Sequence, residues 1–247
     1  MDCRLIIDGH APGTWNMAMD EALLQSAGRA GQGGCLRFYL WEQPTLSLGY
    51  FQEHEDRARH EASLACPIVR RSTGGGAIVH DRELTYSFTC HVPHRGKVDP
   101  FSLYDAFHTT LVDELAGFGI SASLCVATIQ PRDQVEPFLC FERRSRGDVL
   151  IGDAKIAGSA QRRHQKALLQ HGSVLLRKSV ASPELKGIGD LAGVSIQPAD
   201  LASRWASRVG QQLGLSLKPD NPAIEEFGMA KRLVEERFAN RHWTCRK

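Results

Sequence analysis

Residues 70–81 read RRSTGGGAIVHD, with three consecutive glycines between two apolar segments that are typical of strands. Glycine adds no side chain to a sheet and costs backbone entropy, so three in a row indicate that another group approaches the backbone closely. Charged residues flank the glycines on both sides: Arg70 and Arg71 before them, His80 and Asp81 after them. A flexible hairpin loop would explain a bare glycine triplet, but the flanking charges favour a loop that binds a ligand.

A second segment of small residues strengthens this interpretation. Residues 152–173 read GDAKIAGSAQRRHQKALLQHGS, and Lys155 precedes the small residues Gly158, Ser159 and Ala160. Most lysines are solvated on the surface, so Lys155 alone does not indicate a site. Beside an open run of small residues it adds a cation to the predicted ligand-binding site.

The cysteines indicate neither a metal site nor a disulfide framework. Seven cysteines lie at positions 3, 35, 66, 90, 125, 140 and 245, without a CxxC pair or zinc-ligand spacing. An odd number at scattered positions favours a reducing compartment. Cys140 differs from the others because Arg143, Arg144 and Arg146 follow it, and nearby cations favour the nucleophilic thiolate. From the residues alone, packing remains the more common role for such a cysteine.

Five motifs between about residues 33 and 180 carry a resemblance to a known family. They are WEQPTLSLGYFQ at 41–52, RRSTGGGAIVHD at 70–81, ELTYS at 83–87, KIAGSAQRR at 155–163 and LLQHGSVLL at 168–176. With them the chain resembles the lipoate/biotin protein ligase superfamily. It is most similar to the octanoyltransferase branch of the lipoate–protein ligase A type, because HDRELTYS occurs together with a Cys-Phe-Glu at 140–142 ahead of GSAQ.

The resemblance implies an enzyme of lipoate biosynthesis and protein lipoylation. Cys140 would take an octanoyl group from octanoyl-acyl carrier protein as a thioester intermediate and pass it to a lysine of a lipoyl domain or of a glycine-cleavage H-type protein. Lys155 would be the second catalytic residue, stabilising the thiolate and polarising the carbonyl. No metal or cofactor is implied. The expected substrate-binding residues are Arg70, Arg71, Gly74, Gly75, Gly76, His80, Gly158, Ser159, Ala160, His171 and Gly172.

Two alternatives remain open at this point. In an ATP-dependent lipoate–protein ligase, Lys155 and Arg70 would hold an acyl-adenylate, Mg²⁺ would accompany the nucleotide, and Cys140 would be incidental. In a non-catalytic carrier-binding module, the chain would hold a lipoyl domain or a fatty acid without turnover. A requirement for ATP separates the transferase from the ligase.

The order of predicted elements favours an α+β fold, and the resemblance implies a mixed sheet core with flanking helices. Strands are expected at residues 4–7, 35–41, 45–48, 68–71, 77–79, 84–90, 148–151, 155–160 and 167–176. Helices are expected from residue 14, at 53–63, from a capping box at Ser102 and Asp105 to Gly119, and at 182–191, 198–213 and 222–238. We expect a single catalytic domain over residues 1–247, with a helix-rich part from about 180 to 247.

Composition excludes several classes of protein. The 247 residues are 42% hydrophobic and 23% charged, as in an ordinary globular protein. A net charge of +2 is too small to indicate nucleic-acid binding. No segment approaches the ~20 apolar residues of a membrane span, and the N-terminus lacks the apolar stretch of a signal peptide. We therefore expect a cytoplasmic protein.

Overall fold

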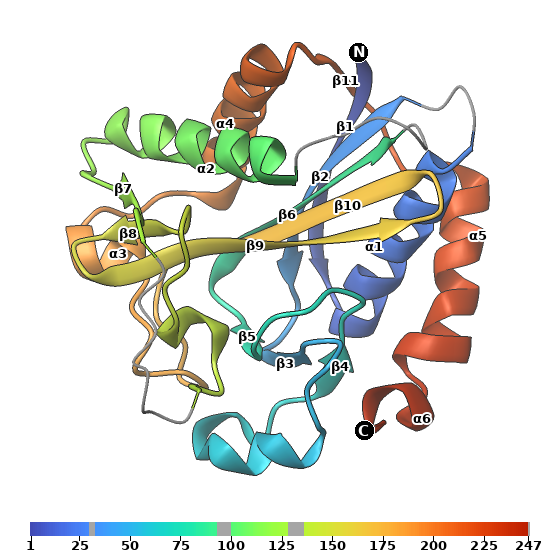
Figure 1. Ribbon diagram of the computed structural model, residues 1–247, viewed down its shortest axis with the longest axis horizontal. Coiled ribbons are helices and arrows are strands. Elements are labelled where there is room, and N and C mark those ends of the chain that lie inside the picture. Colours follow the sequence, from blue (N-terminus) through green and yellow to red (C-terminus); the bar gives the residue numbers. More distant parts are fainter. Residues whose placement is uncertain (30–32, 93–99, 128–135, 247) are drawn as a thin grey trace.

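The computed structural model describes residues 1–29, 33–92, 100–127 and 136–246 (Figure 1). Within these residues the main element is an eight-stranded mixed sheet. Its order is β11 (Ser216–Pro219), β1 (Asp2–Ala11), β2 (Gly34–Trp41), β6 (Glu83–His91), β10 (Ala167–Leu175), β9 (Ala154–His164), β8 (Val149–Ile151) and β7 (Ser123–Leu124). A second sheet of three strands contains β4 (Ile68–Arg70), β3 (Thr45–Leu48) and β5 (Ile78–His80). With the helices this confirms the expected α+β class.

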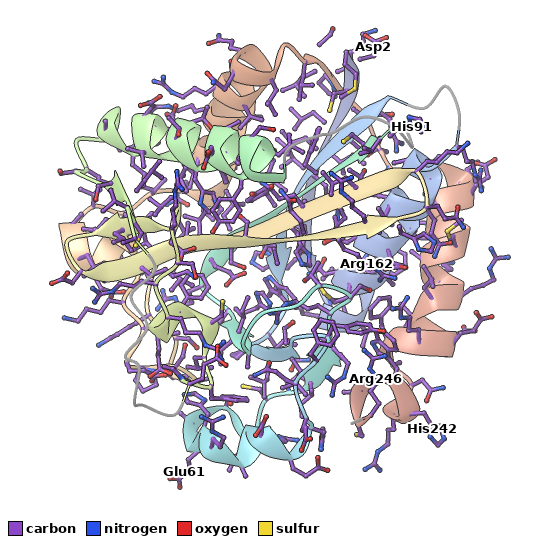
Figure 2. All side chains as sticks on the ribbon, in the orientation of Figure 1. Asp2, Glu61, His91, Arg162, His242 and Arg246 are labelled. Carbon is purple, nitrogen blue, oxygen red and sulfur yellow. The ribbon has the colours of Figure 1, made fainter. Side chains whose placement is uncertain are left out.

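Helices cover both faces of the large sheet (Figure 1). One face packs against α1 (Gly13–Ala27) and α5 (Ile224–Leu233), and the other against α2 (Pro100–Ala116) and α4 (Pro198–Leu213). Side chains alternate between the two cores along β2, because successive residues of a strand point to opposite faces. Leu36 and Phe38 join the core beneath α2 and α4, while Cys35 and Tyr39 join the core beneath α1. Figure 2 shows how side chains fill the space between the layers.

Most predicted elements form near their expected positions, and the limits of β3 and α4 agree residue by residue. The hairpin of β9 and β10 is longer than expected, because its ladder continues from Val174 paired with Ala157 to Ala167 paired with His164. The strand β11 was not predicted. It is short and largely exposed, and it forms by pairing in parallel with β1, a partner more than 200 residues away.

Four helix predictions need correction. Residues 53–63 form two short 3-10 helices, Glu55–Arg59 and Glu61–Ser63, because the first has no buried residue that would anchor a longer helix on the core. Between 182 and 191 only α3 (Ile188–Ala192) forms, after Gly187 in an extended conformation. The helix expected to begin with a capping box at Ser102 begins at Pro100 instead. After α5 the chain continues as a π-helical turn, Val234–Phe238, before α6 (Arg241–Thr244).

Candidate active site

A pocket that opens to solvent lies where the glycine loop, the Cys140 segment and the β9–β10 hairpin meet. Apolar side chains, including Met17, Ile78 and Phe141, form part of its wall. The pocket is lined by ten of the thirteen residues that the sequence predicted for the site: Arg71, Gly74, Gly75, His80, Cys140, Gly158, Ser159, Ala160, His171 and Gly172.

The glycine loop, residues 74–76, wraps around the buried guanidinium of Arg71. Arg71 Nη2 donates to the carbonyls of Gly74 at 2.8 Å and Gly76 at 2.7 Å, and Nη1 donates to Ser47 O at 3.0 Å. Gly75 has a φ of +95°, and a Cβ there would lie 2.9 Å from Arg71 Nη2. Glycine is therefore required both for the backbone conformation and for the close approach of the arginine. Burial lowers the pKa of Arg71 to about 10.

The same loop positions the predicted nucleophile. Directly after it, Ala77 N donates to Phe138 O at 3.0 Å, and Cys140 N donates to Ala77 O at 2.7 Å. A Cβ on Gly76 would lie 3.1 Å from Cys140 N, so Gly76 allows the two segments to approach although it does not line the pocket. Cys140 begins a short 3-10 helix, Cys140–Glu142, and its side chain is partly exposed to the pocket.

Lys155 on β9 approaches Cys140, as the sequence predicted. Its Nζ lies 3.9 Å from Cys140 Sγ and 3.4 Å from Cys140 O. The ammonium also pairs with Asp148 Oδ2 at 2.8 Å, and both side chains are buried. A Cβ on Gly158 would lie 2.8 Å from Lys155 Nζ, so the small residue leaves space for the lysine. The arrangement places a fixed positive charge beside a thiol that faces a pocket.

Asp148 was not predicted as a site residue. Tyr104 Oη donates to its Oδ1 at 2.7 Å, and Ser145 N donates to its Oδ2 at 2.7 Å. Together with Lys155 these donors satisfy both carboxylate oxygens and fix the orientation of the ion pair. The antiparallel pairing of β8 and β9, with Val149 opposite Ala157, brings Asp148 next to Lys155, and no spacing in the sequence indicated this contact.

The basic segment after Cys140 contributes less than expected. Arg143 donates to Pro137 O and pairs with Glu136, and Arg144 lies 3.2 Å from Asp153. Lys155 Nζ instead lies 3.9 Å from the sulfur. The arginines that follow Cys140 lead away from it, because the short 3-10 helix ends at Glu142 and the backbone is extended from Arg143.

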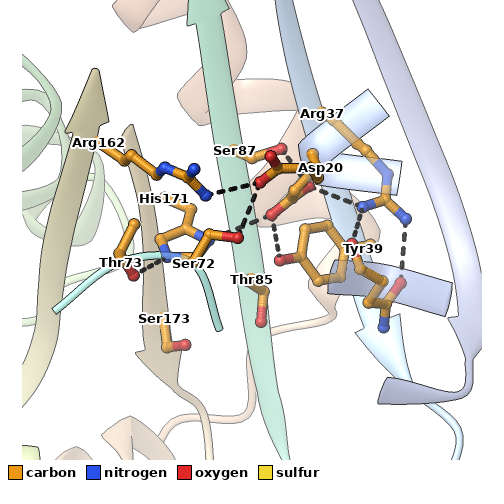
Figure 3. A network of polar contacts seen from close by, with 12 residues as sticks. Asp20, Arg37, Tyr39, Ser72, Thr73, Thr85, Ser87, Arg162, His171 and Ser173 are labelled. Carbon is orange, nitrogen blue, oxygen red and sulfur yellow. Dashed lines mark hydrogen bonds and ion pairs between the residues drawn. The ribbon is translucent and has the colours of Figure 1, made fainter. Parts of the chain in front are cut away.

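A buried polar network links His171 of β10 to α1 (Figure 3). His171 Nε2 lies 2.7 Å from Thr73 Oγ1, and Nδ1 lies 3.2 Å from Asp20 Oδ2. Asp20 also accepts hydrogen bonds from Arg37 at 2.9 Å, Tyr39 at 2.9 Å and Ser87 at 2.7 Å. Burial opposes ionisation of Asp20, but the hydrogen bond from His171 and the charge of Arg37 lower the pKa of this carboxyl below its ordinary value.

The adjacent Glu21 extends the network to the loop. It accepts hydrogen bonds from Ser72 at 2.7 Å and Arg162 at 2.9 Å. Asp20 and Glu21 were not predicted as part of the site. The signal that could have indicated them is their position among the apolar residues of a helix, because carboxylates that become buried require partners.

His80 is held against Trp41 and Glu83. Its ring is stacked on the indole of Trp41 with 3.9 Å between centroids, and its Nδ1 lies 2.7 Å from Glu83 Oε1. Glu83 was also missed by the sequence analysis. The i, i+3 spacing of His80 and Glu83 across the turn between β5 and β6 was the signal that could have indicated the pair.

Arg70 does not line the pocket. Its guanidinium donates to Gln52 O at 2.5 Å, Thr244 O at 2.9 Å and Arg246 O at 3.0 Å. Arg246 lies beside α6 near the C-terminus (Figure 2). Arg70 therefore ties the C-terminal segment to the loop after β3, whereas Arg71 faces the opposite way, into the glycine loop.

Two further properties concern the whole described chain. None of its helices is long and apolar enough to cross a membrane. Among the same residues, no group of three His, Cys, Asp or Glu side chains is arranged to hold a metal ion.

Comparisons with known proteins agree with this architecture. The family model for the lipoyl protein ligase A/B catalytic domain matches residues 12–190. The chain is 32% identical to an octanoyltransferase LipM of Symbiobacterium thermophilum, over 99% of this chain and 98% of the relative. It is 38% identical to an octanoyltransferase LipM of Macrococcus caseolyticus, over 94% of each. A lipoate-protein ligase A bound with ATP superimposes with a TM-score of 0.78 at 23% identity, covering 99% of both chains, which shows a shared fold.

Proposed function

We propose that this chain, which belongs to the lipoyl protein ligase A/B catalytic domain family, is an octanoyltransferase. It moves an octanoyl group from octanoyl-acyl carrier protein to Cys140 and then to a lysine of a lipoyl domain or H-type protein. The observation that carries the proposal is Cys140, which lines the same pocket as the glycine loop and has its Sγ 3.9 Å from Lys155 Nζ. Relatives that match over nearly the full length and carry the name octanoyltransferase support it.

In the first half-reaction, the Cys140 thiolate attacks the thioester carbonyl of the donor. The C–S bond to Cys140 forms, the bond to the carrier's thiol breaks, and the carrier leaves as a thiol after taking up a proton. Lys155 stabilises the thiolate before attack and lies close enough to stabilise negative charge that develops on the carbonyl oxygen. Asp148 keeps the ammonium in place throughout.

The pocket holds the acyl chain during both half-reactions. Met17, Ile78 and Phe141 supply apolar surface beside Cys140. Burying the seven carbons beyond the carbonyl at ~0.8 kcal/mol each contributes about 6 kcal/mol of binding free energy. The enzyme can therefore distinguish octanoyl from much shorter chains by apolar contact alone.

The second half-reaction forms an amide. The ε-amine of the acceptor lysine attacks the thioester carbonyl on Cys140, and the cysteine leaves. An amide is more stable than a thioester, so this step drives the sequence forward. We place the reaction in the cytoplasm, where the free cysteines stay reduced.

The ligase alternative is less well supported by the positions of the cations. Arg70, which would have held the phosphate of an adenylate, donates to backbone carbonyls away from the pocket. Arg71 is committed to the loop carbonyls and Lys155 to Asp148. An adenylate phosphate would have to compete with these contacts. A thioester carbonyl needs only the positive charge of Lys155 where it already lies.

The decisive experiment incubates the protein with octanoyl-acyl carrier protein and a lipoyl domain, with and without Mg-ATP. We expect octanoylation of the lipoyl lysine without ATP, and mass spectrometry should detect an octanoyl adduct on Cys140 that hydroxylamine removes. Cys140→Ala should abolish the adduct and the product. Product formed only from free octanoate with Mg-ATP would instead identify a ligase, and carrier binding without turnover would identify a binding module.

A further inference from the structure

His80 has one ring nitrogen that is buried and has no partner. The side chain is 4% exposed and lines the pocket together with Cys140. Stacking on Trp41 at an interplanar angle of 5° fixes the plane of the ring. Nδ1 is used by Glu83, but Nε2, on the other side of the ring, has no hydrogen-bond partner among the described residues. A polar atom in such a position is normally satisfied, so its partner is expected to be a ligand.

The surroundings of Glu83 determine which nitrogen carries the proton. Thr85 Oγ1 donates to Glu83 Oε1 at 2.5 Å, and Ser173 Oγ donates to the same oxygen at 2.7 Å. An oxygen that accepts these hydroxyl protons also accepts the Nδ1 proton of His80. Burial lowers the pKa of His80, and the opposing charge of Glu83 does not restore it, so the ring is neutral at pH 7. Nε2 therefore presents a lone pair.

The other buried histidines around the pocket lack this feature. His171 uses Nε2 for Thr73 and Nδ1 for Asp20. His108, which contacts the pocket residue Ser159, uses Nδ1 for Gly147 O at 2.6 Å and Nε2 for Ser159 Oγ at 2.7 Å. Of these three histidines, only His80 has a ring nitrogen left to accept a hydrogen bond. The donor that it would bind is an N–H group of a substrate.

We infer that His80 is the general base of the second half-reaction, an inference that rests on the proposed octanoyl transfer. The acceptor lysine arrives as an ammonium and must lose a proton to attack. Neutral His80 Nε2 accepts that proton, and Glu83 keeps the imidazole in the required tautomer and stabilises the imidazolium. Lys155 cannot do the same, because it is already an ammonium paired with Asp148.

The lysine ammonium passes one proton to His80 Nε2, and its nitrogen then bonds to the thioester carbon. That nitrogen loses a second proton to solvent, so that a neutral amide forms. The tetrahedral intermediate collapses, the C–S bond breaks, and the Cys140 thiolate leaves beside Lys155. The products are the amide and the free enzyme, and His80 releases its proton to solvent for the next cycle. Glu83, Arg71 and His171 are the charged or titratable groups that influence this proton transfer.

The test separates the two half-reactions. Octanoyl-enzyme is prepared from octanoyl-acyl carrier protein, quantified by mass spectrometry, and mixed with a lipoyl domain in a single-turnover experiment. For His80→Gln we expect normal formation of the Cys140 adduct but a fall in amide formation of about 10²- to 10⁴-fold, the usual contribution of a positioned base. The remaining rate should rise with pH, because only lysine that is already uncharged then reacts.

A second variant tests the tautomer without removing the imidazole. In Glu83→Gln the side-chain amide can donate to Nδ1, which moves the proton to Nε2 and removes the lone pair. The same selective loss of amide formation is expected. Hydroxylamine, which is uncharged at neutral pH, needs no deprotonation and should cleave the octanoyl-enzyme of both variants at nearly the wild-type rate.

His108→Gln is the matched control, because it also removes a buried imidazole. It should leave the ratio of the two half-reaction rates as in the wild type, with folding of all variants checked by thermal unfolding. Absence of a Cys140 adduct in the wild type would refute the proposed transferase. A normal adduct with wild-type amide formation in His80→Gln, or an equal loss of the lysine and hydroxylamine reactions, would refute only the base.

Discussion

Replacing Lys155 by methionine removes one charge from the site while keeping most of the side-chain volume. In the wild type its Nζ lies 3.9 Å from Cys140 Sγ. Two unit charges at this distance attract by about 4 kcal/mol at an effective dielectric constant of ~20. The carboxylate of Asp148 is bonded to the same ammonium and repels the thiolate, and we take it to cancel roughly half of this attraction.

About 2 kcal/mol of thiolate stabilisation then remains, which corresponds to about a 30-fold effect on an equilibrium. Lys155→Met should therefore lower the rate at which iodoacetamide alkylates Cys140 at neutral pH by about 30-fold. Formation of the octanoyl adduct should slow by a similar factor. Peptide-level mass spectrometry follows Cys140 separately from the other cysteines. Burial raises the pKa of Cys3 and Cys35 to about 12, so these two should remain unmodified.

Stability must be separated from chemistry in this variant. Without Lys155 the Asp148 carboxylate stays buried and loses one partner, which typically costs about 3–5 kcal/mol. The double variant Lys155→Met/Asp148→Asn removes both charges and should recover most of that stability in urea unfolding. It should still alkylate slowly, because the positive charge near the sulfur is absent.

Equal alkylation rates of Lys155→Met and the wild type across the pH range would refute the electrostatic role of Lys155. A double variant that regains the wild-type rate would refute it as well, since Lys155 would then act only through folding. A Lys155→Arg variant should restore part of the rate, because it keeps the charge but not the shape of the ammonium.

Three further predictions concern the loop, the pocket and the stability of the protein. A Cβ on Gly49 would lie 1.9 Å from Gly75 O, so Gly49→Ala should lower the unfolding free energy by about 1–3 kcal/mol. An unchanged midpoint of urea unfolding would contradict the close approach of Gly49 to Gly75. Ile78→Trp should shift the acyl preference towards shorter acyl chains by about fourfold per excluded methylene, measured by competition between octanoyl and hexanoyl donors. Unchanged selectivity would show that the acyl chain does not bind beside Ile78. Burial lowers the pKa of His108 from 6.5 to about 4, so between these pH values the unfolded chain binds more protons than the folded protein. The free energy of unfolding should therefore fall as the pH drops from 6.5 to 4. His108→Gln should flatten this part of the plot of unfolding free energy against pH.

The sequence by itself predicted most of the residues that line the candidate site, and most of the sheet. The strand at residues 45–48 and the helix at 198–213 were predictable without tertiary information. Both depend on local periodicity, and the helix also on the proline at its start. The glycine triplet likewise indicated a close backbone approach, because the absence of three successive side chains is a local property of the chain. Cys140 and Lys155 were identified by motif resemblance, because their spacing of 15 residues carries no geometric signal of its own.

The tertiary structure decided which of these residues work together. Arg70 and Arg71 are neighbours at the end of a strand and therefore point in opposite directions, but only the fold determines that Arg71 enters the glycine loop while Arg70 holds the C-terminal segment. Asp20 and Asp148 acquire their roles through strand and helix packing across long sequence separations. Charge pairs and hydrogen bonds act over a few ångströms, and the distances between such residues are set by strand register and packing rather than by local sequence.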